Sequence, residues 1–244
     1  LALAEPIARA VKEKGYTKPS PIQAKAIPVV LQGGDLLASA QTGTGKTAVF
    51  TLPVLQQLLD KPRASGNRCK ALVLTPTREL AEQVLQSLQR YSEQLPLRSY
   101  AVYGGVSINP QMMALRKGVD VLVATPGRLL DLYRQNAIKF NQLQVLVLDE
   151  ADRMLDLGFA DELDQLFSAL PRKRQTLLFS ATFSALIRQM ADGLLRDPLT
   201  IDISPRNSAI DSVEQWIIPV DKKRKTELFM QLLSERQWPQ TLVF

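Results

Sequence analysis

One glycine-rich stretch sets the architecture of this chain: Ala40-Gln41-Thr42-Gly43-Thr44-Gly45-Lys46-Thr47. An apolar run, 36–38, precedes it, and the helix-forming residues 48–52 follow it. A strand, a glycine loop and a helix N-terminus together bind anions, because free backbone N–H groups and the positive end of the helix dipole converge there. The Lys46 ammonium would neutralise β- and γ-phosphate charge, and the Thr47 hydroxyl would ligate Mg²⁺. The stretch therefore predicts a site for nucleotide phosphates.

The general phosphate-loop pattern is not matched in full, since Ala40 stands where that pattern has its first glycine. A plain turn rich in glycine and threonine is the alternative. The segment Asp149-Glu150-Ala151-Asp152 argues against it, because three carboxylates directly after an apolar run need a compensating cation. Asp149 would hold Mg²⁺ through its hydration shell, and Glu150 would orient or deprotonate an attacking water. Together the two motifs predict Mg-dependent hydrolysis of a nucleoside triphosphate.

The composition narrows the class of protein. The 244 residues, 45% hydrophobic and 22% charged, are typical of a globular protein with a sizeable core. The absence of histidine excludes Ser-His-Asp and Cys-His catalysis and histidine-ligated zinc within this sequence. A single cysteine, Cys69, excludes an intramolecular disulfide and fits a reducing cytoplasm. No apolar run approaches the length of a membrane span, and the net charge of +6 permits a polyanionic partner.

Apolar runs alternate with amphipathic stretches, which predicts an α/β fold with a mostly parallel sheet and helices on both faces. Ligands of such sheets bind at the carboxyl ends of the strands, so the residues after each run are candidate site residues. Two helices, at 1–14 and at 21 to about 31, precede the sheet. The runs are 36–38, 71–74, 99–102, 119–124, 145–148, 176–179 and 199–203, and the helices between them include about 78–92, 109–117, 127–135 and 158–169.

Several of these strand ends share a pattern. Thr-Pro pairs open helices ahead of Arg78 and Arg128, and a third strand end carries Gly104-Gly105. Free N–H groups at helix N-termini, threonine hydroxyls and arginines suit the phosphates of an extended nucleic-acid strand. Ordinary helix capping with a solvent-exposed arginine is the alternative for each pair alone. Because the sequence offers no cluster of aromatic residues for base stacking, we expect little dependence on base sequence.

These motifs, taken together, resemble those of the DEAD-box ATP-dependent RNA helicases. The resemblance implies a RecA-like P-loop NTPase domain with ATP and Mg²⁺ as cofactors and RNA as partner. The stretches 104–111 and 220–225 look like the bacterial RhlE-type subgroup. The matching motifs span about residues 15–182 and are, in order, Gly15-Tyr16-(x2)-Pro19-Ser20-Pro21-Ile22-Gln23, AQTGTGKT, PTREL, Gly104-Gly105, TPGR, DEAD and SAT.

The resemblance also implies a role for each matching residue. Gln23 would recognise adenine, although its spacing alone also fits a solvent-facing helix glutamine. Asp152, Ser180 and Thr182 would couple the nucleotide state to RNA and to a second domain; simple capping is their alternative. The nucleotide would be held by Gln23, Ala40, Gln41, Thr42, Gly43, Thr44, Gly45, Lys46 and Thr47, with Lys46, Asp149 and Glu150 catalytic and Thr47 and Asp149 at the metal. The RNA backbone would be contacted by Thr77, Arg78, Gly105, Thr125, Gly127 and Arg128.

The family pattern implies two RecA-like domains, and we expect this sequence to hold the first at 1–203, a linker at 204–218 and the truncated start of the second at 219–244. The segment 216–244 would form a strand, a helix and an interior strand at 241–244 without its neighbours, loosely held. The basic run 222–225 would begin the helix, with a nucleic-acid patch as the alternative. The family's adenine-stacking aromatic residue would fall before Leu1. We therefore expect a piece of a longer protein.

The motifs predict a helicase that couples ATP hydrolysis to local separation of RNA strands. The second domain would supply arginines to the ATP site, and such an arginine is worth about 10³–10⁵ in rate, so the piece alone would be weakly active. A GTPase is less consistent with the sequence, because the nearest guanine-type signature, Thr17-Lys18-Pro19-Ser20, lacks the aspartate. A nucleotide-gated RNA clamp without productive turnover remains the alternative.

Overall fold

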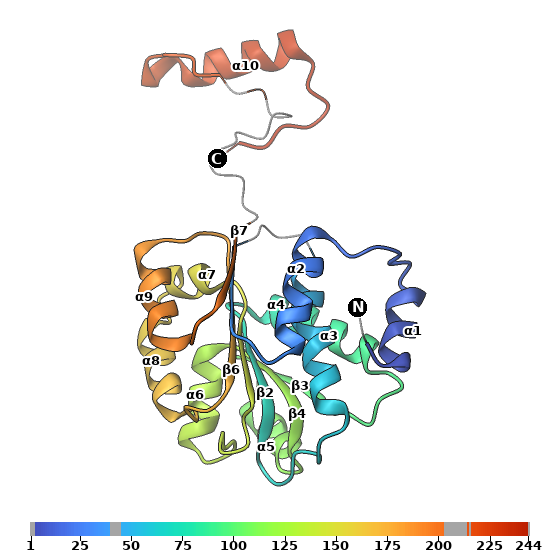
Figure 1. The fold of residues 1–244 in the computed structure, drawn as a ribbon. Helices are drawn as coiled ribbons and strands as arrows, with labels where there is room; N and C mark the ends of the chain where they lie inside the picture. Colours follow the sequence, from blue (N-terminus) through green and yellow to red (C-terminus); the bar gives the residue numbers. More distant parts are fainter. Residues whose placement is uncertain (1–2, 40–44, 203–213, 215, 244) are drawn as a thin grey trace. The chain divides into compact units, whose positions relative to one another are not determined.

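The computed structural model describes residues 3–39, 45–202, 214 and 216–243. They belong to two compact units, Leu1–Ser204 and Pro205–Phe244, which are considered separately. The first unit is built on a seven-stranded sheet, in which every strand pairing among the described residues is parallel (Figure 1). In the order β3-β4-β2-β5-β6-β1-β7 across the sheet, the strands are Ser99–Val102, Val119–Ala124, Cys69–Leu74, Val145–Leu148, Gln175–Ser180, Leu36–Ser39 and Leu199–Asp202.

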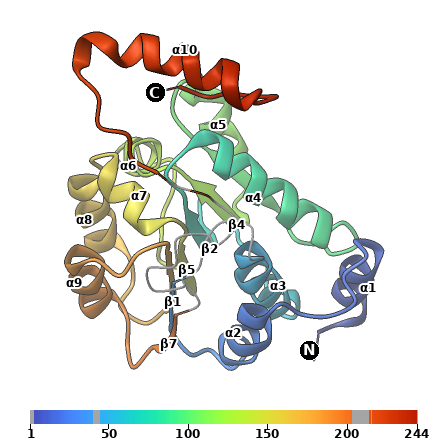
Figure 2. The same cartoon turned by 90° about the horizontal axis from the view of Figure 1, so that it is seen from above.

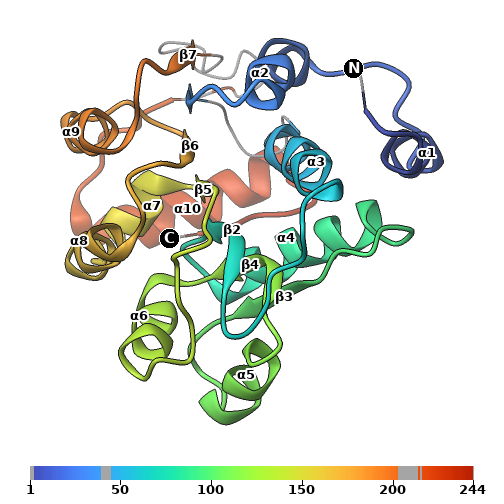
Figure 3. The same ribbon diagram turned by 60° about the horizontal axis from the view of Figure 1, so that its bottom comes forward.

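Helices cover both faces of this sheet, as Figure 2 and Figure 3 show from two further directions. Each face has its own apolar cluster, so the sheet is buried on both sides. One face carries α1 Glu5–Glu13, α2 Pro21–Leu31, α3 Lys46–Leu59 and α4 Arg78–Tyr91. The other carries α5 Ile108–Leu115, α6 Pro126–Arg134, α7 Ala151–Asp156, α8 Ala160–Ala169 and α9 Ala185–Leu194.

Strand β2 shows why the apolar runs are continuous. All six of its residues are buried, and successive side chains point to opposite faces. Ala71 and Val73 pack into the cluster under α3 and α4, whereas Leu72 and Leu74 pack into the cluster on the other face. A strand covered on both faces needs apolar residues at most positions, and in β2 the exception is Lys70, near the start of the strand. The predicted α/β architecture is therefore confirmed.

The end of the sheet away from the strand-end motifs is held by a buried carboxylate. Asp120, 2% exposed, lies near the start of β4. It accepts hydrogen bonds from Arg63 Nε at 2.7 Å, from the backbone N–H of Ala64 at 2.9 Å and from that of Arg98 at 2.8 Å. These donors compensate the buried charge and fix the loops that enter β2 and β3. These hydrogen bonds therefore fix where β2, β3 and β4 begin relative to one another.

The predicted element boundaries hold to within a few residues, with two omissions. Helices α7 and α9 were not predicted, although a parallel connection from β6 to β7 requires a crossover of the kind that α9 provides. The first helix begins at Glu5 rather than at residue 1 among the described positions. Residue 203, the last of the predicted run 199–203, lies outside the described residues. None of the helices in the described parts of the chain is both long and apolar enough to cross a membrane.

In the second unit, a short 3₁₀ turn, Lys222–Arg224, leads into α10, Lys225–Arg236, as expected for the basic run. The rings of Trp216 and Trp238 lie 6.1 Å apart within this unit. The prediction of two strands is wrong for the described residues, because neither 216–220 nor 241–243 forms a β-strand. A strand needs a neighbour for its backbone groups, and the side chains of Leu242 and Val243 are 79% and 65% exposed.

Candidate nucleotide site and nucleic-acid interface

The order of the strands sorts the strand-end motifs into two groups. The Gly-Gly, TPGR and PTREL motifs follow β3, β4 and β2, which are neighbours in the sheet. The DEAD, SAT and glycine-rich motifs follow β5, β6 and β1, which are also neighbours. The predicted RNA contacts therefore lie on one half of the sheet and the predicted nucleotide contacts on the other.

Backbone hydrogen bonds join successive motifs along this edge. The N–H of Thr125 donates to Val102 O at 3.1 Å, and the N–H of Thr75 donates to Ala124 O at 2.9 Å. The N–H of Asp149 donates to the carbonyl oxygen of the last β2 residue at 2.9 Å. The ladder thus continues one residue past the strands, and the motifs cannot shift along the strand direction independently of one another.

A cavity of about 320 Å³ lies at the N-terminus of α3. The Lys46 side chain and the Asp149 carboxylate, in residues 6% and 4% exposed, meet at this cavity. Within the described part of the chain, Lys46 Nζ and Asp149 Oδ1 are buried without a hydrogen-bond partner. Buried charged groups that lack hydrogen bonds are costly, so this arrangement could accommodate a charged ligand. Its lining includes the predicted residues Gln23, Gly45, Lys46, Thr47, Asp149 and Glu150.

The electrostatics of Asp149 agree with a place for a cation. Burial raises the pKa of the Asp149 carboxyl to about 6; the Lys46 ammonium lowers this pKa, whereas the carboxylate of Glu150 raises it. A divalent cation would stabilise the ionised form. No group of three or more His, Cys, Asp or Glu side chains converges among the described residues to form an all-protein metal site. A sparse site suits Mg²⁺, which keeps waters and takes further ligands from phosphates.

Gln23 joins α2 to the end of the glycine-rich loop. Its Oε1 accepts from the backbone N–H of Ser20 at 2.9 Å, and its Nε2 donates to Gly45 O at 3.1 Å. Gly45 has φ +85°, which favours glycine, and a Cβ there would lie 2.5 Å from Gln23 Nε2, so the glutamine side chain would have to move away. Gln23 therefore lies at the cavity, rather than facing solvent alone. The predicted residues 40–44 of the loop lie outside the described residues.

Glu150 is held in an unusual conformation. It has φ +56° and ψ +54° at the N-cap of α7, a left-handed geometry that is costly for a residue with a side chain. Its carboxylate is paired with Arg153, with Glu150 Oε2 at 3.4 Å from Arg153 Nη1. Arg153 was not predicted as a site residue; the signal for it is its position three residues after Glu150, which places the two on one helical face.

The three predicted coupling residues meet next to this site. Oδ2 of Asp152 accepts from the backbone N–H groups of Ala181 and Thr182 at 3.0 and 3.1 Å. Ser180 ends β6 fully buried, and its Oγ accepts from the N–H of Thr182 at 3.3 Å. The DEAD and SAT motifs are thus bonded to each other across the β5–β6 pair.

The two Thr-Pro corners differ in their capping. Thr77 Oγ1 accepts from the N–H of Leu80 at 3.2 Å, so this hydroxyl caps helix α4, as the alternative interpretation predicted. Thr125 occupies the N-cap of α6 without a side-chain cap bond and is 8% exposed. Around Gly127, no atom lies within 4 Å of where a Cβ would be, so the backbone there is open to a ligand.

The two arginines of these corners point to the same loop. Arg128 Nη2 donates to Val106 O at 2.8 Å. The Arg78 guanidinium carbon lies 5.9 Å from the ring centroid of Tyr103, within cation–π range. Gly105, between these two loop residues, has φ +79°. Both Thr-Pro corners therefore contact residues 103–107, the loop that contains Gly104-Gly105.

The prediction missed two other groups of residues. The cavity at the N-terminus of α3 is also lined by Tyr16, Lys14 and Tyr91. Lys14 Nζ donates to the Tyr91 hydroxyl at 3.3 Å, and burial raises the pKa of Tyr91 to about 12. Gln111, 5% exposed, contacts the 103–107 loop. Its signal was a polar side chain at an apolar-face position of the predicted helix, three residues after Ile108.

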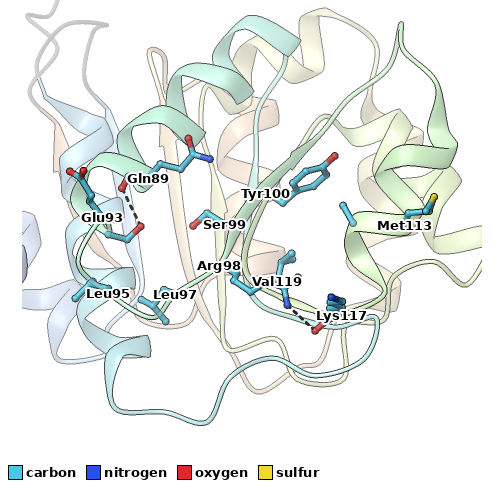
Figure 4. Close-up of a pocket in the computed structure, with 12 residues that line it drawn as sticks. Gln89, Glu93, Leu95, Leu97, Arg98, Ser99, Tyr100, Met113, Lys117 and Val119 are labelled. Carbon is cyan, nitrogen blue, oxygen red and sulfur yellow. Dashed lines mark hydrogen bonds between the residues drawn. The ribbon is translucent and has the colours of Figure 1, made fainter.

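A larger cavity, about 580 Å³, lies elsewhere (Figure 4). It is lined by the C-terminal part of α4, the start of β3 and one side of α5, including Glu93, Tyr100, Met113 and Lys117. None of the predicted site residues lines it. The larger cavity therefore does not coincide with the predicted site.

Comparison with known proteins gives a consistent result. The family model described as DEAD/DEAH box helicase matches residues 20–190. The DEAD-box ATP-dependent RNA helicase RhpA of Helicobacter pylori strain B128 is 41% identical over 244 residues, 100% of this chain and 49% of that protein. The ATP-dependent RNA helicase CshA of Listeria monocytogenes is 39% identical over 99% of this chain and 46% of its own length. This chain thus spans about half the length of these relatives.

A solved structure shows the same architecture. The crystal structure of a DEAD box protein from the hyperthermophile Methanococcus jannaschii matches with a TM-score of 0.78 and 33% identity, over 96% of this chain and 62% of that one. The similarity confirms the expected RecA-like fold. The family model covers most of the first unit and includes all the strand-end motifs. This chain belongs to the DEAD/DEAH box helicase family.

Proposed function

We propose that this chain is the ATP-binding half of an ATP-dependent RNA helicase, which hydrolyses ATP and separates RNA strands locally. The observation that carries the proposal is the pair of unpartnered buried charges, Lys46 Nζ and Asp149 Oδ1, in one cavity with Gln23 and Glu150. The Gly-Gly, TPGR and PTREL motifs, which follow the neighbouring strands β3, β4 and β2, support an RNA partner. We assign the protein to the cytoplasm on its single free cysteine, and to the RhlE-type subgroup on residues 104–111 and 220–225.

In this proposal each cavity residue has a defined task. Lys46 neutralises charge on the β- and γ-phosphates, and Glu150 orients or deprotonates the water that attacks the γ-phosphate in line. Gln23 reads the adenine edge while holding Gly45. Thr47 and Asp149 would hold Mg²⁺, which would supply neutralisation of the developing phosphate charge.

The RNA contacts would come from Thr77, Arg78, Gly105, Thr125, Gly127 and Arg128. Such contacts involve N–H groups, hydroxyls and guanidinium groups, which recognise phosphates and carry no information on base sequence. Asp152, Ser180 and Thr182 would transmit the nucleotide state. The region 219–244 would begin the second RecA-like domain after a linker at 204–218, and the rest of that domain would complete the ATP site.

The test is the ATPase rate with and without single-stranded RNA, on this chain and on a version extended through a complete second domain. We expect strong RNA-stimulated turnover only in the extended protein. If neither protein responds to RNA, the Thr-Pro-Arg corners are helix caps and the RNA proposal fails. If RNA and ATP bind cooperatively but multiple turnover is absent, the nucleotide-gated clamp replaces the helicase.

A further inference from the structure

Strand β3 lies at the edge of the sheet, where β4 is its neighbour among the described strands, and alternate residues of β3 form hydrogen bonds to β4. The carbonyls of Arg98 and Val102 accept hydrogen bonds from Val121 N and Thr125 N at 3.1 Å each, both toward β4. Because the hydrogen-bonding direction alternates along a strand, the backbone groups of Tyr103 point away from β4. No strand of the described ranges lies on that side of β3, so no neighbouring strand pairs with these groups.

The Gln111 side chain takes the place of that missing strand. Its Oε1 accepts from the N–H of Tyr103 at 3.2 Å, and its Nε2 donates to Tyr103 O at 3.2 Å. The same Nε2 donates to Ser107 O at 3.3 Å, four residues along the chain. One buried amide thus bonds both ends of the loop 103–107, and its oxygen and nitrogen are both satisfied.

Further contacts tie the same loop to two other helices. The Tyr103 hydroxyl donates to the Glu82 carboxylate on α4, and Arg128 on α6 donates to Val106 O at 2.8 Å. The loop contains Gly104-Gly105, which carry the most backbone freedom. Without these ties a ligand would have to order the loop on binding, at a cost in affinity.

We propose that Gln111 is a positioning residue for RNA: it fixes the 103–107 loop so that Gly105, Arg78 and Arg128 present one preformed phosphate-binding surface. The inference rests on the proposed function. Gln111 itself is buried, and within the described part of the chain its side-chain hydrogen bonds go to Tyr103 and Ser107, so its effect on RNA would be indirect. The larger cavity of Figure 4 borders the start of β3, and Gln111 does not line it.

The experiment compares Gln111→Met with Gln86→Met in the 244-residue chain. Methionine matches glutamine in length but cannot bond to Tyr103, and Gln86 is an exposed glutamine on α4. Binding is measured by anisotropy with a fluorescein-labelled oligouridine and, separately, with a fluorescent ATP analogue. Amide exchange of the peptide covering 99–107 is followed without RNA.

We expect Gln111→Met to bind RNA about tenfold more weakly, with ATP-analogue affinity unchanged and faster exchange at 103–107. Gln86→Met should match the wild type throughout. A general structural role would instead lower both affinities together. If Gln111→Met does not fold, Gln111→Asn decides, because its shorter amide cannot make the same set of bonds and should give the same selective loss.

Two outcomes overturn the inference and are distinguishable. If the wild type binds RNA and Gln111→Met binds it equally well, Gln111 does not position the loop, while the proposed function stands. If the wild type itself does not bind RNA, the proposed function fails for this chain and the inference fails with it. The first conclusion holds even if exchange at 103–107 becomes faster.

Discussion

The carboxylate of Asp152 accepts two hydrogen bonds from Thr182, one from its backbone N–H at 3.1 Å and one from its hydroxyl at 3.3 Å. Asp152 lies two residues after Glu150, whereas Thr182 lies just beyond β6. A displacement of either segment therefore disturbs the other. These hydrogen bonds would transmit a movement of one residue to the other, as the predicted coupling role requires.

We expect Asp152→Asn to uncouple nucleotide from RNA. The substitution replaces one carboxylate oxygen with an NH₂ group, which cannot accept from the donors of Ala181 and Thr182. Coupling between two ligands is typically about 1–3 kcal/mol, or about 5–150-fold in affinity, and that factor should fall toward one. The measurement is the dissociation constant for an ATP analogue with and without RNA, in the protein extended through a second domain.

The matched control is Asp156→Asn, the same substitution at an exposed position of the same helix. It should leave the coupling factor at its wild-type value. If RNA still strengthens nucleotide binding to the Asp152→Asn protein by the wild-type factor, the Asp152–Thr182 contact only stabilises the local structure and does not couple the two ligands.

Glu150→Gln should abolish turnover while sparing nucleotide binding. Glutamine keeps the size of the side chain but removes the basic carboxylate, and general base catalysis contributes about 10²–10⁴-fold in rate. Single-turnover hydrolysis and ATP-analogue binding in the extended protein separate the two effects. Unchanged turnover would remove Glu150 from its proposed role. Glu162→Gln, at a half-buried position of α8, serves as the control.

The fold could be predicted from the sequence because its signals are local. A strand buried on both faces, such as β2, is apolar over the continuous run 71–74, and the Thr-Pro corner at Thr125 marks where a strand ends and a helix begins. The order of strands in the sheet, by contrast, depends on contacts between segments that are far apart in the sequence. No spacing in the sequence places β3 beside β4, or β1 beside β6, so the separation of RNA-type from nucleotide-type motifs emerged only in three dimensions.

The site shows the same division. Lys46 and Asp149 could be named from their motifs, since each motif has a recognised chemistry. Gln111 could not, because its task depends on β3 being an edge strand, which follows from the sheet order. The strand expected at 241–244 is wrong for 241–243, because the sequence pattern reports a preference for extended backbone and not the presence of a neighbour.

Cys69 should be unreactive in the native protein. Burial raises the pKa of its thiol to about 12, and its side chain is fully buried in β2. At pH 8 the folded protein should react with a thiol reagent only as fast as the first unit opens, whereas the unfolded chain, with a thiol pKa of about 8.5, should react at once. Because Cys69 is the only cysteine, the reaction reports on this unit alone. Rapid native labelling would contradict the burial of β2.

The raised pKa of Cys69 also gives a pH dependence of stability. Above about pH 8.5 the unfolded chain releases the thiol proton while the folded chain retains it, so stability falls as pH rises toward about 12. The stability of a Cys69→Ala variant lacks this contribution. The difference in free energy of unfolding between wild type and variant should therefore shift against the wild type above that pH. A difference that stays constant from pH 7 to 10 would refute the shift.

Residues 216–243 should be loosely held in this chain. The apolar residues Ile217, Leu242 and Val243 are 95%, 79% and 65% exposed, and helix α10 has no buried residue among its described positions. An isolated helix of this length is marginal in water, because most helix stability comes from packing of an apolar face. Amide exchange across 219–243 should therefore be fast, and that across β2 slow. Completing the second domain should slow exchange in α10 and in 241–243, where the strand would gain its neighbours. Uniformly strong protection of 219–243 in the present chain would mean that this segment already has a packing partner, which the exposure of its apolar side chains contradicts.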